Sequence, residues 1–251
     1  MPDPKKGDVS PVVPMDNFSK YIPFLLEIRK RFLFSISLFI VASIIGFIFY
    51  DRIITFILNF FSLKGVNIVF TTPFQYFTLA LNCGFVVGIV VVIPVFIYQV
   101  LSFLKPALKP KEFRLTVSLM PLALILFVCG FFYGVSMIKY VVQIFYQTSV
   151  KLNIGNILDV ENFLSKVLIT GLLMGISFLF PVAMTILMQL KLVKYQAFTK
   201  LRLTAYLVGA MFVMLMPPPD IISDLILFAP LGILFELTLL FNRVFLKTHL
   251  M

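Results

Sequence analysis

The chain has 251 residues, 61% of them hydrophobic and 13% charged, and a formal net charge of +10. Its mean hydropathy is +1.06, whereas a soluble domain carries about a quarter of charged residues. The sequence therefore predicts an all-α integral membrane protein. The positive charge is spread over the flanks of apolar runs, which is typical of membrane topology and argues against nucleic-acid binding.

Six apolar runs are candidates for membrane-spanning helices, since a bilayer core of roughly 30 Å needs about 20 helical residues. The fifth run has only 14 residues, so it can stop short of the far surface and leave the last two helices as a shallow hairpin. The prolines at 217–219 force a turn between those two helices. The predicted spans are residues 32–50, 74–103, 116–140, 163–190, 203–216 and 221–241.

The distribution of Lys and Arg predicts the orientation of these spans. Sixteen of the 21 lie in residues 1–31, 104–115, 191–202 and the C-terminal tail, and five lie on the alternate side. This bias predicts that both termini are cytoplasmic. Residues 1–20 are predicted to form a disordered polar tail without a cleavable signal peptide. Residues 21–245 are predicted to form the membrane domain, and residues 246–251 a second tail.

The outer connections and the prolines add detail to this bundle. Residues 51–73 and 141–162 carry apolar residues at near-helical spacing and are predicted to form short amphipathic helices, with Asp159 as an N-cap. Pro94 and Pro181 are expected to kink long helices, and Pro121 and Pro230 to do so nearer helix ends. Kinked helices can curve around a concavity, although membrane helices also tolerate proline without such a role.

Two glutamates lie inside basic clusters at a membrane edge. Glu27 lies in the run EIRKR, at 27–31, and Glu112 lies in KPKEFR, at 109–114. Together they are candidates for an acidic spot that binds a cationic ligand. The alternative is that each glutamate pairs with its neighbours: Glu27 can reach Arg31 four residues later, a pairing worth only about 0.2–0.5 kcal/mol.

Other polar residues lie within or beside the spans. A charge at mid-span costs about 2.5–3.5 kcal/mol on insertion scales, so Glu236 is expected to face protein or water, to be protonated, or to reach the membrane surface. Polar amides near spans more often bridge helices than bind a ligand; these are Asn82, Gln99 and Gln189. Asp220 and Asp224 are expected to cap the last helix.

Several motifs recur in a fixed order along the chain. LLEIRKR at 25–31 is similar to H-L-x-E-L-R-x-R, and the run at 94–108 to P-V-x-x-Y-Q-x-W-x-F-x-x-P-x-L. KEFR at 111–114 is similar to K-x-E-R-R. Further matches lie at 200–209, 218–220 and 234–237. In this order the chain resembles the TatC family, the multi-spanning receptor subunit of the twin-arginine protein translocase, over residues 18–245.

The chain also departs from the pattern of that family. Phe24 and Leu101 stand where the family motifs have His and Trp, and Gln75 stands at a commonly acidic position. In the fourth helix, the family usually carries Glu or Gln between Phe and the residue before Pro. Leu179 holds that place here, in FLFP, so the role of the polar group cannot be carried over to it.

The resemblance implies a six-helix, concave bundle that receives signal peptides bearing two adjacent arginines on folded cargo. It further implies partner subunits of the single-span TatA and TatB type, a homo-oligomer within a complex, surrounding lipid, and a bacterial or archaeal cytoplasmic membrane. It implies neither a cofactor nor a metal. The signal-peptide residues would be Glu27, Arg29, Phe103, Lys111, Glu112 and Arg114. The partner or intramembrane contacts would be Gln75, Leu179, Pro181, Asp220 and Glu236.

Two other classes of function are weighed against this one. A small-solute or ion transporter is disfavoured because mid-span ionisable residues are scarce and no internal repeat is evident. An enzyme is disfavoured because the sole histidine, His249, lies in the C-terminal tail and no catalytic motif is found. No phosphate-binding loop is present, which argues against ATP hydrolysis by this chain.

Overall fold

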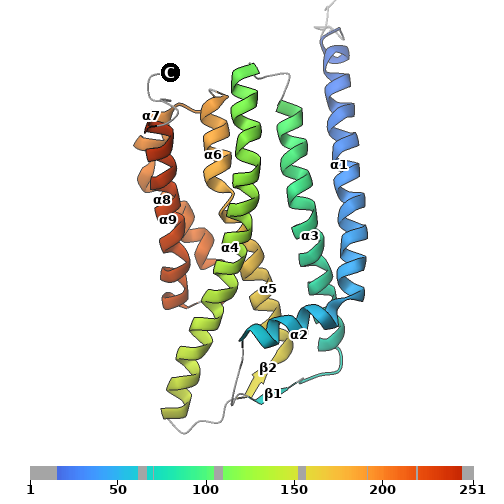
Figure 1. Ribbon diagram of the computed structural model, residues 1–251, viewed down its shortest axis with the longest axis vertical. Coiled ribbons are helices and arrows are strands. Elements are labelled where there is room, and N and C mark those ends of the chain that lie inside the picture. The colour runs from blue at the N-terminus through green and yellow to red at the C-terminus, as the bar shows by residue number, and fades with distance from the viewer. Residues whose placement is uncertain are drawn as a thin grey trace, which may run out of the picture.

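The computed structural model describes residues 16–61, 67–69, 71–104, 110–151, 157–190, 192–218 and 220–244. These residues form an upright bundle of helices with a small sheet at one end (Figure 1). In chain order the helices are α1 (Asp16–Ile48), α2 (Tyr50–Phe61), α3 (Gln75–Leu104), α4 (Pro110–Lys151), α5 (Val160–Ser177), α6 (Phe180–Gln189), α7 (Tyr195–Lys200), α8 (Arg202–Met214) and α9 (Ile221–Val244). The strands are β1 (Asn67–Val69) and β2 (Ile157–Asp159).

The predicted all-α membrane fold is confirmed. Among the described residues, five stretches are long and apolar enough to cross a membrane: Leu26–Ile48, Gln75–Phe103, Val117–Ser149, Val160–Gln189 and Ile221–Val244. The fifth predicted span corresponds to α8, which has 13 residues and is shorter than a membrane-crossing helix. The turn between α8 and α9 lies part-way along α4 rather than at its far end (Figure 1), so these two helices form the shallow hairpin.

The helices at the first and third predicted spans, α1 and α4, have other ends than the sequence predicted. α1 begins at Asp16, inside the segment predicted as a tail; residues 1–15 and 245–251 lie outside the described part of the chain. α4 runs for 42 residues to Lys151, so the separate amphipathic helix predicted over 141–162 is wrong. Residues 135–154 contain neither Gly nor Pro, so nothing in the sequence interrupts the helix. The predicted outer helix within 51–73 is confirmed as α2.

A two-stranded parallel sheet joins the outer connections. β1 follows α2 and β2 precedes α5, with Asn67 opposite Ile157 and Val69 opposite Asp159. The sheet lies at the end of the bundle opposite the one where α9 finishes (Figure 1). Strands of three residues carry too short a pattern to be recognised from sequence, and this pair was not predicted.

Glycines set the close approach of the helix pairs that build the bundle. In α3, a Cβ added at Gly84 would lie 2.7 Å from Ser43 O of α1. In α4, a Cβ at Gly134 would lie 2.8 Å from Thr170 O and 3.0 Å from Gly171 Cα, both of α5. Small residues at such positions let membrane helices pack backbone to backbone. The main buried core lies mostly between α3, α4 and α5, with contributions from α2, α8 and α9.

The fourth predicted span, 163–190, is interrupted. α5 ends at Ser177 and α6 begins at Phe180, with Phe178 and Leu179 in the turn between them. Pro181 occupies the first turn of α6, where its missing N–H costs no helical hydrogen bond. The helix was expected to bend at Pro181, and the structure confirms an interruption there, between α5 and α6. By contrast, α3, α4 and α9 continue through Pro94, Pro121 and Pro230.

Candidate functional site

The basic end of the bundle lies where α1 and α4 begin and where α3, α6 and α9 end (Figure 1). Exposed cations from five helices and one connection gather on this end: Arg29, Lys30, Arg114, Lys194, Lys200, Arg202 and Arg243. A surface of this kind attracts anions, so a carboxylate within it changes the local chemistry.

Glu27 is that carboxylate. Its Oε1 atom accepts hydrogen bonds from Arg31 Nε at 3.2 Å and from Arg31 Nη2 at 2.5 Å. The pairing within α1 that the sequence allowed is therefore confirmed. The Glu27 side chain nevertheless remains 48% exposed, against 26% for Arg31. An exposed pair contributes little to stability because water screens both charges, so Glu27 stays accessible to a ligand.

Arg31 also ties this pair to a second helix. Its Nη1 atom donates to Gln99 O of α3 at 2.8 Å, and Nη2 donates to Ser102 Oγ at 3.3 Å. The Ser35 hydroxyl of α1 donates to Gln99 Oε1 at 2.9 Å. The prediction that Gln99 bridges helices is thus confirmed. Arg31 and Ser102 were not predicted as site residues, because contacts across about 70 positions leave no trace in a local motif.

The other predicted signal-peptide residues lie at the same end. Phe103 is half-buried in the last turn of α3, and Arg29 and Arg114 are exposed on α1 and α4. Lys111 and Glu112 belong to the first turn of α4, and their side chains lie outside the described part of the structure. The fold therefore brings the backbones of all six residues to one end of the bundle.

Glu236 lies on α9 near the same end. Its Oε1 atom accepts a hydrogen bond from Tyr206 at 2.6 Å, and Arg202 Nη2 lies 3.5 Å from Oε2. Both partners belong to α8. Glu236 thus faces protein and is also partly exposed, at 42% of its side chain. A cleft of about 560 Å³ lies beside it and is otherwise mainly apolar, lined also by Ala229, Gly232, Ile233, Leu237 and Leu240.

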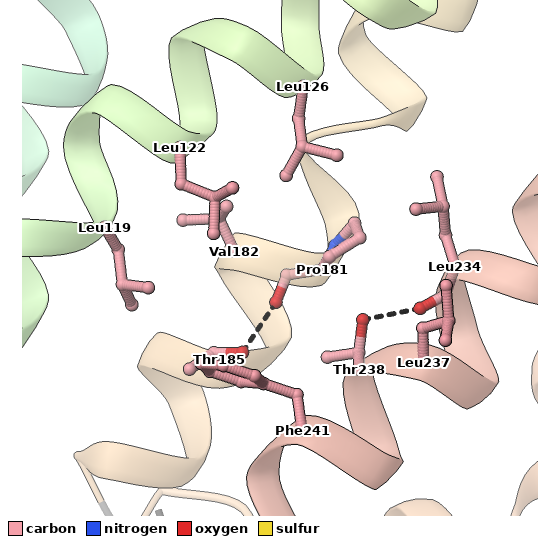
Figure 2. A pocket seen from close by; sticks show the side chains of 10 residues that line it. All are labelled: Leu119, Leu122, Leu126, Pro181, Val182, Thr185, Leu234, Leu237, Thr238 and Phe241. Atoms are coloured by element: carbon pink, nitrogen blue, oxygen red, sulfur yellow. Dashed lines mark hydrogen bonds between the residues drawn. The ribbon is translucent and has the colours of Figure 1, made fainter. Parts of the chain in front are cut away.

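Pro181 and Leu179 lie deeper in the bundle. Pro181 lines an apolar cavity of about 150 Å³ between α4, α6 and α9 (Figure 2). The two hydroxyls that line this cavity are already bonded within their own helices, Thr185 to Pro181 O at 2.8 Å and Thr238 to Leu234 O at 2.6 Å. The cavity therefore presents hydrocarbon. Leu179 is half-buried and packs against the main core.

Gln75 lies at the opposite end, beside the sheet. Its Nε2 atom donates to Asp159 Oδ2 at 2.7 Å, and its Oε1 atom accepts from the amide of Thr71 at 2.8 Å. The Thr71 hydroxyl donates to the same Asp159 oxygen at 2.6 Å, and Asn162 N donates to Oδ1 at 2.9 Å. Asp159 is thus the predicted N-cap of α5. The Thr71 hydroxyl, followed by the other donors, lowers the pKa of Asp159 from 3.8 to about 2.

Asp220 lies at the turn between α8 and α9. It accepts a hydrogen bond from Ser223 N at 2.8 Å and so caps α9, as predicted. Within the described residues, no group of three or more His, Cys, Asp and Glu side chains comes together as metal ligands would.

The motifs, the spans and the carboxylate at the basic end direct attention to one family. The family model of the Sec-independent protein translocase protein, TatC, matches residues 23–230. The chain belongs to the TatC family. TatCy of Bacillus subtilis is 27% identical over 231 residues, covering 90% of both chains. TatC of Escherichia coli is 28% identical over 229 residues, covering 89% of this chain and 88% of its own.

Solved structures of TatC show the same fold. Two crystal structures described as the twin arginine translocase receptor TatC superpose with TM-scores of 0.74 and 0.77. Their identities to this chain are 22% and 23%; each covers 88% of this chain, and the matches span 98% and 99% of the solved chains. At this identity the likeness concerns the fold. With the family assignment, it places the chain among multi-pass proteins of the cytoplasmic membrane.

Proposed function

We propose that this chain is a twin-arginine signal-peptide receptor and a core subunit of a translocase that exports folded proteins across the cytoplasmic membrane. Membership of the TatC family supports the proposal, and two solved relatives are described as the twin arginine translocase receptor. The observation that assigns peptide binding to particular atoms is the half-exposed carboxylate of Glu27 within a basic surface. Neighbouring cations would repel a cationic peptide, so binding needs such a carboxylate.

The chemistry of the ligand fits this carboxylate. An arginine guanidinium is always charged and donates hydrogen bonds in a planar fork that matches a carboxylate. Glu27 would take one arginine of the pair, and Glu112, in the first turn of α4, would take the other. Phe103, half-buried at the end of α3, would contact the apolar residue that follows the arginines. Arg29, Lys111 and Arg114 would lie around this site.

Contacts with single-span subunits of the TatA and TatB type form a second part of the proposal. The apolar cavity at Pro181 and the cleft beside Glu236 offer hydrocarbon surfaces to a partner helix within the membrane. Gln75, beside the sheet, and Asp220, in the turn between α8 and α9, are both hydrogen-bonded within the chain. They would contribute through the surfaces around them rather than as free polar groups. At Leu179 the contact would be apolar, and assembly as a homo-oligomer within this complex belongs to the same proposal.

Crosslinking of a twin-arginine peptide tests the receptor site. Glu27→Gln and Glu112→Gln keep side-chain volume and remove charge, so each is expected to reduce crosslinking to membranes about five- to tenfold. This corresponds to roughly 1–1.4 kcal/mol of one charge-assisted contact. Glu161→Gln is the matched control, because Glu161 lies at the opposite end in the first turn of α5. Full crosslinking in both variants, at unchanged membrane levels, would remove the assignment.

A further inference from the structure

Arg31 bonds only one of the two carboxylate oxygens of Glu27. Two of its nitrogens, Nε and Nη2, converge on a single oxygen of Glu27, Oε1. A carboxylate has about four acceptor sites, two on each oxygen. Among the contacts of the described residues, Oε2 of Glu27 accepts no hydrogen bond and the side chain is half exposed. One oxygen of the carboxylate is therefore held by the protein, and the other is left for a ligand.

The group that holds Oε1 is itself fixed in place. Arg31 is anchored on α3 by the carbonyl of Gln99 and the hydroxyl of Ser102. Gln99 is locked in turn by the hydroxyl of Ser35, which is buried at 7% exposure between α1 and α3. These anchors are made to α3 and do not involve Glu27. The position of the guanidinium that holds the Glu27 carboxylate is thus set by the packing of α1 against α3.

We propose that Arg31 is a positioning residue that makes the site selective for arginine over lysine. By fixing Oε1, it presents Oε2 at a defined angle to the arriving side chain. A guanidinium can place two N–H groups on that oxygen, as Arg31 does on Oε1, provided that the oxygen is oriented. An ammonium is a compact point charge without this requirement. Loss of the orientation should therefore weaken the binding of an arginine ligand more than that of a lysine ligand.

This inference rests on the proposed function, and the charge of Arg31 makes the choice of variant decisive. Arg31→Gln would remove a cation that repels the ligand, which alone favours binding. Arg31→Lys keeps the positive charge and removes the planar fork, so it isolates geometry. Lys30→Gln is the control for charge, because Lys30 is exposed beside Arg31. Ser102→Ala removes one anchor of Arg31 and leaves its charge and its contact with Glu27.

The experiment measures the affinity of the purified full chain in lipid nanodiscs for two labelled peptides, one with a twin-arginine pair and one with twin lysines. In Arg31→Lys, the ratio of the two affinities should fall roughly five- to tenfold, with the lysine peptide changed less than twofold. Ser102→Ala should lower the ratio about twofold. Lys30→Gln should strengthen binding of both peptides alike and leave the ratio unchanged.

The possible outcomes separate this inference from the proposed function. If the wild-type chain binds neither peptide, the receptor proposal itself fails. If the wild type prefers the arginine peptide and Arg31→Lys preserves that preference, the positioning role is wrong while the receptor remains. If Arg31→Lys does not fold, Ser102→Ala decides, and an unchanged ratio in that variant overturns the inference.

Discussion

At the residue scale, Asp159 shows how one side chain can join several connections. Its two oxygens accept hydrogen bonds from Thr71, Gln75 and Asn162, which belong to the segment before α3, to α3 and to α5. All these bonds need the ionised carboxylate or are strengthened by it. Gln75 can donate to Asp159 through its amide, whereas an acidic residue, common at this position in the family, could not.

The lowered pKa of Asp159 predicts how stability depends on pH. The ionised form is favoured by the fold, so its contribution is fully present above the unfolded pKa of about 4 and is lost as pH falls through about 2. Asp159→Asn should lower the thermal midpoint at pH 7. Its difference from the wild type should shrink between pH 4 and pH 2, as followed by thermal unfolding in detergent.

The control for this prediction is Glu161→Gln. Glu161 lies two residues further on and accepts one long hydrogen bond, from Ser165 at 3.3 Å. Glu161→Gln should therefore lower the thermal midpoint at pH 7 less than Asp159→Asn does. A difference between Asp159→Asn and the wild type that stays constant down to pH 2 would show that the carboxylate does not hold these connections together.

Residues also show where sequence reasoning reaches its limit. The pairing of Glu27 with Arg31 follows from helical spacing, and the capping roles of Asp159 and Asp220 follow from their places before apolar runs. The contacts of Arg31 with Gln99 and Ser102 depend on how α1 packs against α3. No local pattern encodes that register, so the group that orients Glu27 could be found only in the folded structure.

At the element scale, α4 and α9 are joined through a proline. Pro230 lies inside α9 and has no N–H, so the carbonyl of Ile226, four residues earlier, loses its helical partner. The hydroxyl of Tyr133, on α4, donates to Ile226 O at 2.7 Å. A carbonyl left bare within a membrane is costly. Tyr133 therefore both repairs the helix defect and fixes the hairpin of α8 and α9 against α4.

This arrangement predicts a specific coupling between two substitutions. Tyr133→Phe should destabilise the protein by about 1 kcal/mol, since it removes one interhelical hydrogen bond and leaves the carbonyl unpaired. With Pro230→Ala in place, the new N–H can bond Ile226 O, and Tyr133→Phe should cost less. Unfolding by denaturant in mixed micelles would measure the four stabilities of this cycle.

Tyr140→Phe provides the matched comparison on the same helix, because Tyr140 is 55% exposed. It should change the free energy of unfolding by much less than Tyr133→Phe. If Tyr133→Phe costs the same in the wild-type chain and in the Pro230→Ala variant, the tyrosine does not compensate for the proline.

The elements themselves were predictable to different degrees. Long apolar runs placed α1, α3, α4 and α9, since no soluble alternative can bury so much hydrocarbon. The end of α4 was assigned to a separate amphipathic helix because polar residues at 143–151 resemble a surface helix when considered alone. The strands were missed because each has three residues, and pairing between residues 90 positions apart sets them.

At the scale of the whole molecule, charge and depth define two unequal ends. The carboxylate site and seven exposed cations lie at the end where α9 finishes, and the sheet with the Asp159 contacts lies at the other end. The α8–α9 hairpin starts and ends at the basic end, and its turn lies part-way along the bundle. At this turn the hydroxyl of Thr170 donates a hydrogen bond to Pro217 O. The positive-inside rule predicts that the basic end faces the cytoplasm.

Cysteine labelling in intact cells tests both the orientation and the shallow hairpin. With Cys83 and Cys129 replaced by Ala, single cysteines at Lys151 and Lys194 report on the two ends of the bundle, where both native side chains are exposed. A membrane-impermeant maleimide should label Lys151→Cys from outside and Lys194→Cys only after the membrane is broken. The reverse pattern would invert the orientation and remove the cytoplasmic receptor site.

A third cysteine, at Ile221, reports on the depth of the hairpin. Ile221 is 85% exposed at the start of α9, so its thiol would be freely accessible if the turn reached the outer surface. Because the turn lies part-way along the bundle, this position should face lipid, where a thiol ionises poorly and a charged reagent does not enter. Ile221→Cys should therefore react at least tenfold more slowly than Lys151→Cys from either side. Equal rates would mean that α8 crosses the whole membrane, which its 13 residues are too few to do.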